Sequence, residues 1–566
     1  MKKLLILCLL TLFLGSSIVL AQTLEAEKSH EISKNARKGE IYHFSYNDDT
    51  KEYLLIYRRD KKKDYLYDIY KYDYDFNEIF HEEVEGTVET RKKYEWVFPT
   101  YFEEEGWNNP KVLRVENNWG GDIVLRKGYL TREWKTKVED RGSYRYTTRY
   151  LKYDFNEEEK IKPKYEGEKA EVDDRAPGFV KKMALAASSK LSLVDYMTDE
   201  PTVEVTTGPR SFAYPSIWAR TRDYASASGD VVVVASNMQY DTQSKNTIVK
   251  YVILKYSAET LDQLKSSEIN YDYPTFPMYK EHLSDGSMAF IFAPASYTKN
   301  TDPNLVNYHY VRVSKDAEVM DNISFDSPGG PWKIYNISLT NDDAVYIYGQ
   351  ASLKDMKKEP QKVYATMDKF DNLQAMKISK HKIDYITSVP MDVVNGQIRT
   401  PSNQKKAKPW GPKDFYLVPE PTITTNGDLI ISGAFTDNGA LHYFQFDNKG
   451  DFKTQYIINT DDPKKSSEFG FLHFLFENPD GTMTMLIPEI KDEKKGQQFR
   501  YPKTATIDLA ANTISDVNSW GYGKKQEFYL DEGYPTTFIN DGNELVFFSR
   551  DKSEKRIWFG RIKLGR

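Results

Sequence analysis

Histidine is the residue type in this sequence best suited to proton transfer and metal binding, yet its spacing offers no local site. The HExxH pattern, which puts two zinc ligands on one helix face, is missing because no two histidines lie closer than 13 residues. The sequence singles out no metal ligand and no cofactor, although a fold that gathers distant residues can assemble a site that spacing does not reveal. The eight histidines are His30, His43, His81, His282, His309, His381, His442 and His473.

Motifs for covalent and phosphate chemistry are missing as well. The chain has no GxSxG nucleophile elbow and no P-loop. Its 84 acidic residues permit a carboxylate pair of the glycosidase kind, but nothing singles out two of them. The Asp/Gly turns lack the DxDxDG spacing of calcium loops. No catalytic residue is nominated, and five tryptophans suit either stacking on sugars or internal packing: Trp96, Trp107, Trp119, Trp332 and Trp410.

Composition narrows the class of protein. The 566 residues carry 78 Lys and Arg against 84 Asp and Glu, a formal net charge of −6. Such a chain has no excess positive charge for a nucleic-acid backbone, so we expect no polynucleotide partner. Aromatic residues make up 14% of the chain, including 41 Tyr and 29 Phe. Because aromatic side chains are enriched in strands, this composition favours a β-rich fold.

Residues 1–21 have the composition of a secretory signal peptide. A lysine pair precedes an apolar run at 4–14, and Ala21 ends a cleavage-site pattern. The single cysteine, Cys8, falls inside this leader, so the predicted mature chain 22–566 has no disulfide, thiolate metal site or cysteine nucleophile. No later run of 18 apolar residues occurs. We therefore expect an exported protein without a transmembrane span.

Two sequence marks alternate along the chain, eight of each. The first is a turn of Asn, Asp and Gly followed directly by an apolar run, as in GDVVVVAS at Asp230. The second is a run of alternating apolar residues that ends in a turn, as in FQFDNKGD at Phe446. Turns of this composition join antiparallel strands. The first marks lie at Tyr53, Asp122, Asp230, Gly286, Asp343, Asp428, Gly481 and Asn543, and the second at Tyr72, Tyr153, Tyr256, Val313, Met367, Phe446, Ile507 and Ile562.

This repeat predicts an all-β fold, a β-propeller of about eight (seven to eight) four-stranded antiparallel blades that form one domain over residues 22–566. The last unit contains three strand patterns, so we expect the segment from Leu24 to Ile32 to supply its fourth strand. Two insertions interrupt the repeat at about 166–211 and 380–415. The first contains VKKMALAASSKLSLVDYM, whose spacing predicts a short helix, and the second is typical of a loop.

Charge differs between the two sets of turns in this predicted architecture. In a four-stranded blade the a–b and c–d turns lie on one face, and the b–c hairpins on the other. The a–b and c–d turns are acidic and the b–c hairpins are basic. Oriented docking on a charged partner is one explanation. The other is that Asp forms tight turns and Lys-rich tips favour solubility. The candidate binding residues of the basic b–c hairpin face are Lys61, Lys62, Lys63, Lys357, Lys358, Lys494 and Lys495.

The signal peptide, large repeat units and Tyr/Lys-rich strands such as YLYDIYKYDYDF resemble those of exported β-propeller proteins of bacteria with Type IX secretion. The resemblance is to the plug subunit of the outer-membrane translocon. It implies a periplasmic protein, peripheral to the outer membrane, that docks on an envelope protein such as an outer-membrane barrel. No diagnostic motif supports it, so no residue roles are carried over.

Three functions remain open at this point. The first is a non-catalytic interaction propeller, which agrees with the charge asymmetry and the missing catalytic motifs. The second is a carbohydrate-active or carbohydrate-binding propeller acting on polysaccharide, since one fold hosts many activities. The third is a propeller that binds a small ligand.

Overall fold

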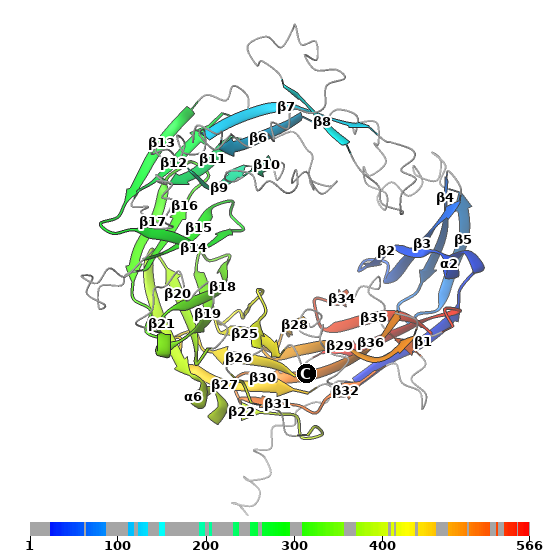
Figure 1. The fold of residues 1–566 in the computed structure, drawn as a ribbon. Coiled ribbons are helices and arrows are strands. Elements are labelled where there is room, and N and C mark those ends of the chain that lie inside the picture. The colour runs from blue at the N-terminus through cyan, green and yellow to red at the C-terminus, as the bar shows by residue number, and fades with distance from the viewer. Residues whose placement is uncertain are drawn as a thin grey trace, which may run out of the picture. The chain divides into compact units, whose positions relative to one another are not determined.

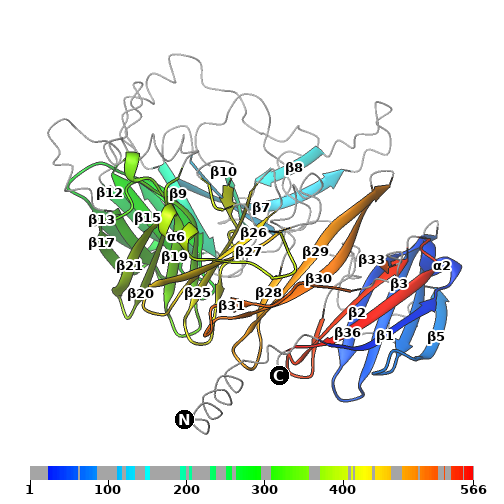
Figure 2. The ribbon, with the colours of Figure 1, turned by 90° about the horizontal axis from the view of Figure 1, so that it is seen from below.

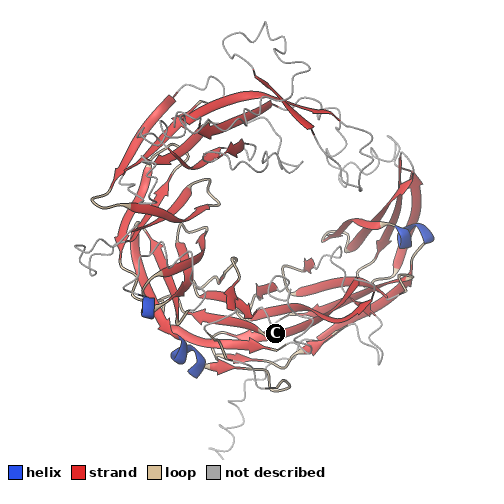
Figure 3. Cartoon of the chain, in the orientation of Figure 1, coloured by secondary structure: helices blue, strands red, loops and turns tan. Residues whose placement is uncertain are grey.

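The computed structural model describes twenty stretches of the chain, and they consist almost entirely of β-strands with a few short helices (Figure 3). The predicted signal peptide, residues 1–21, lies outside them. The described stretches are 23–61, 64–85, 111–117, 123–133, 147–152, 192–198, 203–206, 230–236, 250–257, 263–294, 308–355, 370–405, 409–411, 415–435, 440–459, 474–494, 497–520, 528–529, 537–551 and 553–564.

The described residues form eight sheets (Figure 1). They belong to two compact units: unit 1 comprises Met1–Thr100 with Val389–Arg566, and unit 2 comprises Tyr101–Ser388. Each unit is described by itself. The all-β class and the four-stranded blade-like sheets of a β-propeller are confirmed. The number of blades and the single domain stay predictions.

Unit 2 contains four sheets with strand orders β10-β6-β7-β8, β13-β12-β11-β9, β14-β15-β16-β17 and β18-β19-β20-β21. Their elements are β6 (Lys111–Asn117), β7 (Ile123–Glu133), β8 (Thr147–Lys152), β9 (Ser192–Thr198), β10 (Val203–Thr206), β11 (Val231–Ser236), β12 (Lys250–Tyr256), β13 (Gln263–Asn270), β14 (Thr275–His282), β15 (Met288–Pro294), β16 (Tyr308–Val313), β17 (Val319–Phe325), β18 (Trp332–Leu339), β19 (Val345–Ala351), η3 (Leu353–Asp355), β20 (Asn372–Ser379) and β21 (Lys382–Pro390).

Unit 1 also contains four sheets, with strand orders β2-β3-β4-β5, β22-β27-β26-β25-β23, β28-β29-β30-β31 and β1-β36-β35-β33. Its elements are β1 (Thr23–Glu31), α2 (Lys34–Lys38), β2 (Glu40–Asn47), β3 (Glu52–Lys61), β4 (Asp64–Tyr72), β5 (Glu78–Glu85), α6 (Met391–Gly396), β22 (Ile398–Arg399), β23 (Phe415–Leu417), β24 (Thr422–Ile423), β25 (Leu429–Phe435), β26 (Leu441–Phe446), β27 (Phe452–Ile458), β28 (Phe474–Glu477), β29 (Met483–Lys494), β30 (Gln497–Asp508), β31 (Thr513–Ile514), β32 (Asn518–Ser519), β33 (Phe528–Tyr529), β34 (Thr537–Ile539), β35 (Glu544–Asp551) and β36 (Arg556–Lys563).

Strand β15 shows why the sheets stack. All seven of its residues are buried, because alternate side chains face two different neighbouring sheets. Ala289 and Ile291 pack in one core with Trp332 and Ile347 of the β18–β21 sheet. Their neighbours along the strand pack in a second core with Val232 and Tyr251 of the β9–β13 sheet; they are Met288, Phe290 and Phe292. A strand with two apolar faces requires a sheet on each side, which is the packing of successive propeller blades.

The N-terminal strand completes the last sheet of unit 1, as the sequence predicted. Strand β1 pairs antiparallel with β36, from Thr23 opposite Lys563 to Glu31 opposite Arg556. The chain then turns through α2, which begins after Ser33, and enters β2 of the next sheet. The core shared by these two sheets contains Tyr53 and Phe559. The first and last parts of the described chain are therefore held in one sheet.

Two predicted insertions contain more strand than expected. Within the segment predicted to form a helix, Ser192–Thr198 is the strand β9, which pairs antiparallel with β11, so the helix prediction is wrong there; the part before residue 192 lies outside the described residues. The 380–415 segment is not simply a loop, since it includes β21, the fourth strand of its sheet, and the helix α6. The apolar and β-branched residues of both segments suit a strand equally well, and pairing with a buried neighbour decides the outcome.

The repeat marks locate strands correctly in the six units whose two marks are both described. Asp122 and Tyr153 of the second unit and Met367 of the fifth lie outside the described residues. The third strand of the fifth sheet is β20, which begins after Met367, and its following turn lies at Lys380 and His381. Both turn residues have a positive φ. Lys-His is not a typical turn dipeptide, so this turn carries no sequence signal. Two pairs also depart from the antiparallel prediction, because β10–β6 and β22–β27 run parallel.

Candidate functional site

The basic b–c hairpin face is described at two positions only. Lys61 is the last residue of β3, opposite Asp64 of β4. Lys494 is the last residue of β29, opposite Gln497 of β30. Both therefore stand at the ends of b–c hairpins, as predicted. The remaining five candidates lie outside the described residues; they are Lys62, Lys63, Lys357, Lys358 and Lys495.

The β29–β30 hairpin extends beyond its sheet (Figure 2). On one side the described pairing with β28 reaches Leu486, which lies opposite Phe474, the first described residue of that stretch. On the other, the last flanking hydrogen bond runs from the Trp520 backbone N–H to the Pro502 carbonyl, at 3.0 Å. Residues 488–502, the hairpin arm, then continue with no further partner strand in the described part of the chain. Pro488 stands directly opposite Pro502 at the root of the arm.

The facing prolines limit backbone pairing at the root of the arm. Neither proline has an N–H, so the two residues cannot exchange backbone hydrogen bonds and must form a non-hydrogen-bonded pair. In such a pair the backbone nitrogens face outward, toward the positions that flanking strands would take. Each proline therefore removes one backbone donor from an edge of the hairpin at this position.

The acidic turns have a local structural explanation. The Asp447 carboxylate accepts backbone hydrogen bonds from Lys449 and Asp451, at 3.0 and 2.9 Å. Asp73 caps the turn after β4 in the same way. Partial burial opposes ionisation, but side-chain hydrogen bonds from Asn77 to Asp73 and from Lys453 to Asp447, together with these backbone bonds, lower the pKa of both carboxyl groups. For these turns, the structure thus supports turn formation as the reason for the acidic residues.

A basic residue near the end of the third strand repeatedly joins turns of adjacent sheets. Arg312 of β16 is buried and donates to Asp285 of its own sheet and to Asp343 of the next sheet, both at 2.8 Å. Lys255 of β12 bridges Asp230 and Asp316 in the same manner. Acidic turns are therefore partly neutralised by basic residues of the strands beside them.

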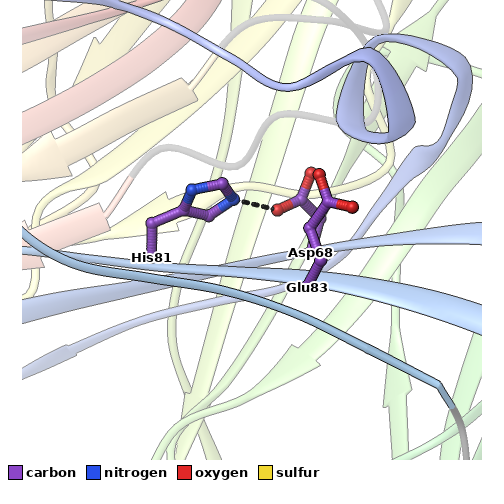
Figure 4. Close-up of side chains that lie close together, drawn as sticks. All are labelled: Asp68, His81 and Glu83. Atoms are coloured by element: carbon purple, nitrogen blue, oxygen red, sulfur yellow. Dashed lines mark hydrogen bonds and ion pairs between the residues drawn. The ribbon is translucent and has the colours of Figure 1, made fainter.

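A cluster of three ionisable side chains lies on one face of β4 and β5 (Figure 4). Asp68 stands directly opposite Glu83, and Tyr70 directly opposite His81, so all four side chains share a face of the pair. The His81 Nε2 and the Asp68 Oδ1 are 2.5 Å apart. One ligand atom from each of Asp68, His81 and Glu83 lies within 4.8 Å of the others. Asp68 is buried, whereas His81 and Glu83 are exposed.

The turn that carries α2 covers this cluster and orients its carboxylates. The second oxygen of Asp68 accepts hydrogen bonds from the Ser33 hydroxyl and from the Ala36 backbone N–H. The Tyr70 hydroxyl also donates to it, at 3.3 Å. Asn35 donates from its side chain to Glu83, at 2.7 Å. The Tyr70 ring stacks under the His81 imidazole with a centroid distance of 4.3 Å, which fixes the plane of the imidazole.

The chemistry open to this cluster is cation binding or proton exchange. The Ser33 hydroxyl donates to Asp68 and not to His81, so the arrangement is not a serine nucleophile activated by histidine. An imidazole nitrogen with two carboxylate oxygens is a ligand set that suits divalent transition metals. No other cluster of metal-ligating side chains occurs within the described stretches.

The cluster has no signal at the residue spacing typical of metal sites on helices. His81 and Glu83 are two residues apart, which in a strand puts both on one face. That alternation, in FHEEVE, was the available signal. Asp68 was not detectable, since its position opposite Glu83 depends on the register of two strands.

Other nominated residues prove to be packing positions. Trp332 and Trp410 are fully buried, so neither is free to stack on a sugar; Trp96, Trp107 and Trp119 lie outside the described residues. His442 is buried among Phe415 and Phe435. His309 packs against two tyrosines, Tyr271 and Tyr273. His473 lies outside the described residues.

Comparisons with known proteins give no family. No family model matches the chain, and no curated protein does. An acylaminoacyl peptidase from Pyrococcus horikoshii is similar over 92% of this chain and 60% of its own, at 8% identity and a TM-score of 0.22. The β-propeller domain of the Trilobed protease from Pyrococcus furiosus is similar over 60% of this chain and 92% of its own, at 8% identity and a TM-score of 0.22. Our chain thus spans less than two thirds of the first of these proteins, and the fold class rests on the sheets themselves.

Proposed function

We propose that this chain is an exported, non-catalytic interaction protein that docks on a partner of the cell envelope through its b–c hairpins. The observation that carries the proposal is the hairpin arm, whose two strands keep their register beyond the described flanking strands of their sheet. Tyr501 at the root of the arm is buried, and a paired ribbon that continues from such a root is suited to contact with another molecule.

The charge of the hairpin arm and the backbone groups along its edges are suited to binding a protein. The arm contains Lys491, Lys494, Lys495 and Arg500 against three acidic residues. A ribbon with two edges also offers backbone donors and acceptors to an extended segment of a partner. The partner we propose has an acidic surface, and basic hairpins of this kind steer association in a salt-dependent manner.

The finer proposal concerns place and partner. The signal-peptide pattern and the resemblance to a Type IX translocon plug subunit support a periplasmic protein, peripheral to the outer membrane and bound to an outer-membrane barrel. No helix in the described part of the chain is long and apolar enough to cross a membrane. The role as a plug rests on the resemblance alone.

The test is copurification from envelopes extracted in mild detergent at low salt. We expect a stoichiometric envelope protein that washes off as the salt concentration rises. Replacing Lys491, Lys494 and Lys495 with Gln is expected to weaken its retention roughly tenfold and to flatten the salt dependence.

A matched control uses lysines of the opposite set of turns. Lys315 and Lys449 are exposed and lie in c–d turns, and their replacement with Gln is expected to leave retention unchanged. Equal loss in both variants would show that net charge alone matters and would contradict docking by the hairpins. Recovery of a partner-free monomer that binds envelope glycans would instead favour the carbohydrate-binding alternative.

A further inference from the structure

We propose that Asp68, His81 and Glu83 bind a divalent transition-metal ion between β4, β5 and the α2 turn. The ligand atoms are the His81 Nε2 and one carboxylate oxygen from each acidic residue. This site is independent of the docking function proposed above.

The negative charges of Asp68 and Glu83 favour a bound cation. Asp68 and Glu83 are direct cross-strand neighbours, and like charges in that position destabilise a sheet. Asp68 is only 2% exposed, which strengthens the need for a compensating positive charge. Among the described residues, neither carboxylate forms an ion pair with a lysine or an arginine. Arg59 bonds to Asn35 and not to either carboxylate, so a bound cation would supply the direct compensating charge.

Hydrogen bonds from neighbouring residues orient the two carboxylates. Ser33, Ala36 and Tyr70 bond to the Oδ2 of Asp68, while its Oδ1 faces His81. Asn35 bonds to the Oε2 of Glu83 and is itself bonded by Arg59 at 2.8 Å. Asp68 thus has one oxygen fixed by neighbours and one directed to His81, and Glu83 has one oxygen fixed by Asn35. Fixed outer partners of this kind are typical of metal ligands, whose orientation they determine.

A bound ion would join β4 and β5 beside the α2 turn. Two ligands come from β5 and one from β4, and the α2 turn is bonded to all but the histidine. That turn follows β1, the strand that completes the C-terminal sheet. A metal here would therefore fix the connection between two sheets of unit 1. Three protein ligands, two of them exposed, leave coordination positions for water or for a side chain of another molecule.

The experiment is calorimetric titration of the purified full chain, free of any polyhistidine tag and treated with EDTA, with ZnCl₂ and then with MnCl₂. We expect one ion per chain at micromolar concentration and a higher Tm with the metal. His81→Gln and Glu83→Gln should each weaken binding roughly tenfold or more. Their circular dichroism spectra in EDTA report whether the chain still folds.

His381→Gln is the matched control. His381 also pairs with a buried aspartate, Asp321, at 2.6 Å, but no second carboxylate of the described chain completes a metal cluster there. Its replacement should leave Zn²⁺ affinity unchanged. The proposal is overturned if the wild-type chain binds neither ion, or if His81→Gln binds as tightly as His381→Gln.

Discussion

Two histidine–aspartate pairs, one in each unit, have nearly the same contact distance. They differ in the charge of the residue that lies across the strand pair from the aspartate. In unit 1 the Nε2 of His81 lies 2.5 Å from Asp68, and in unit 2 the Nδ1 of His381 lies 2.6 Å from Asp321. Both aspartates are buried. Across the strand pair, however, Asp68 faces a carboxylate, Glu83, whereas Asp321 faces a guanidinium, Arg312.

The residue across the strand pair therefore determines what each histidine–aspartate pair can do. Arg312 supplies a permanent positive charge opposite Asp321, so His381, in the turn of the neighbouring sheet, serves to join two sheets. Glu83 adds a second negative charge beside Asp68 and makes that pair a cation site. The comparison teaches that a close His–Asp contact does not by itself indicate function, and that cross-strand register must be read with it.

The largest expected difference between the two pairs is the loss in free energy of unfolding when the aspartate of each pair is replaced. Asp68→Ala leaves the Ser33 and Tyr70 hydroxyls without this acceptor and removes one of the two acceptors of the Ala36 N–H, and it should lower the free energy of unfolding by about 3 kcal/mol in EDTA. Asp321→Ala should cost about 1–2 kcal/mol, since its histidine is mostly exposed. Urea unfolding of both variants measures this. An equal or larger loss for Asp321→Ala would break the comparison.

The next largest effect is expected when the guanidinium of Arg312 in unit 2 is removed. Arg312→Met removes a buried cation that bonds to Asp285 and Asp343 and stands opposite Asp321. We expect a loss of about 2 kcal/mol, less than for a fully buried ion pair because both bonded aspartates are partly exposed. The same urea experiment measures it. Arg58→Met, which removes an exposed ion pair with Glu40, is the control and should cost under about 1 kcal/mol; similar losses in the two variants would remove Arg312 as the distinguishing residue.

The sheets could be predicted from sequence because their signals are local. Asx-Gly turns and period-2 runs lie within a few residues of each other, so strands such as β25 and β26 follow directly from FQFDNKGD and its neighbours. The fourth strand of the last sheet was inferable from a missing element. The turn at Lys380 was not, since it has no turn residues and its conformation depends on the pairing of β20 with β19.

The metal cluster could not be predicted, because it depends on two features that spacing does not show. One is the register that puts Asp68 opposite Glu83, and the other is the fold of Ser33 and Asn35 over that face. Five of the seven basic candidates lie outside the described residues, so their role stays a prediction.

His309 of unit 2 pairs with a tyrosine and not with an aspartate, and its pKa predicts how the free energy of unfolding depends on pH. His309 bonds to the hydroxyl of Tyr273, and burial lowers its pKa to about 4 from an ordinary value of 6.5. The unfolded chain therefore takes up this proton first, and stability that is complete above pH 6.5 is lost as the pH falls toward 4. Allowing for partial exposure, we expect a loss of about 1–2 kcal/mol.

Urea unfolding between pH 7 and pH 4.5 measures this dependence for the wild type and for His309→Gln. The variant should lose less stability than the wild type over the interval, because it has no imidazole to protonate at this position. Parallel curves for the two proteins would show that His309 is not the residue responsible.

The smallest expected effect is also the most specific to the difference between the two pairs. Glu83→Gln removes the like charge opposite Asp68 and keeps the shape of the side chain, so it should raise the free energy of unfolding by about 0.5 kcal/mol in EDTA. The same change should lower the stability gained from Zn²⁺, since a ligand is lost. Glu82→Gln, on the other face of β5, should do neither. A Glu83→Gln chain that is less stable in EDTA would mean that a positive charge already balances Glu83, and that unit 1 needs no metal.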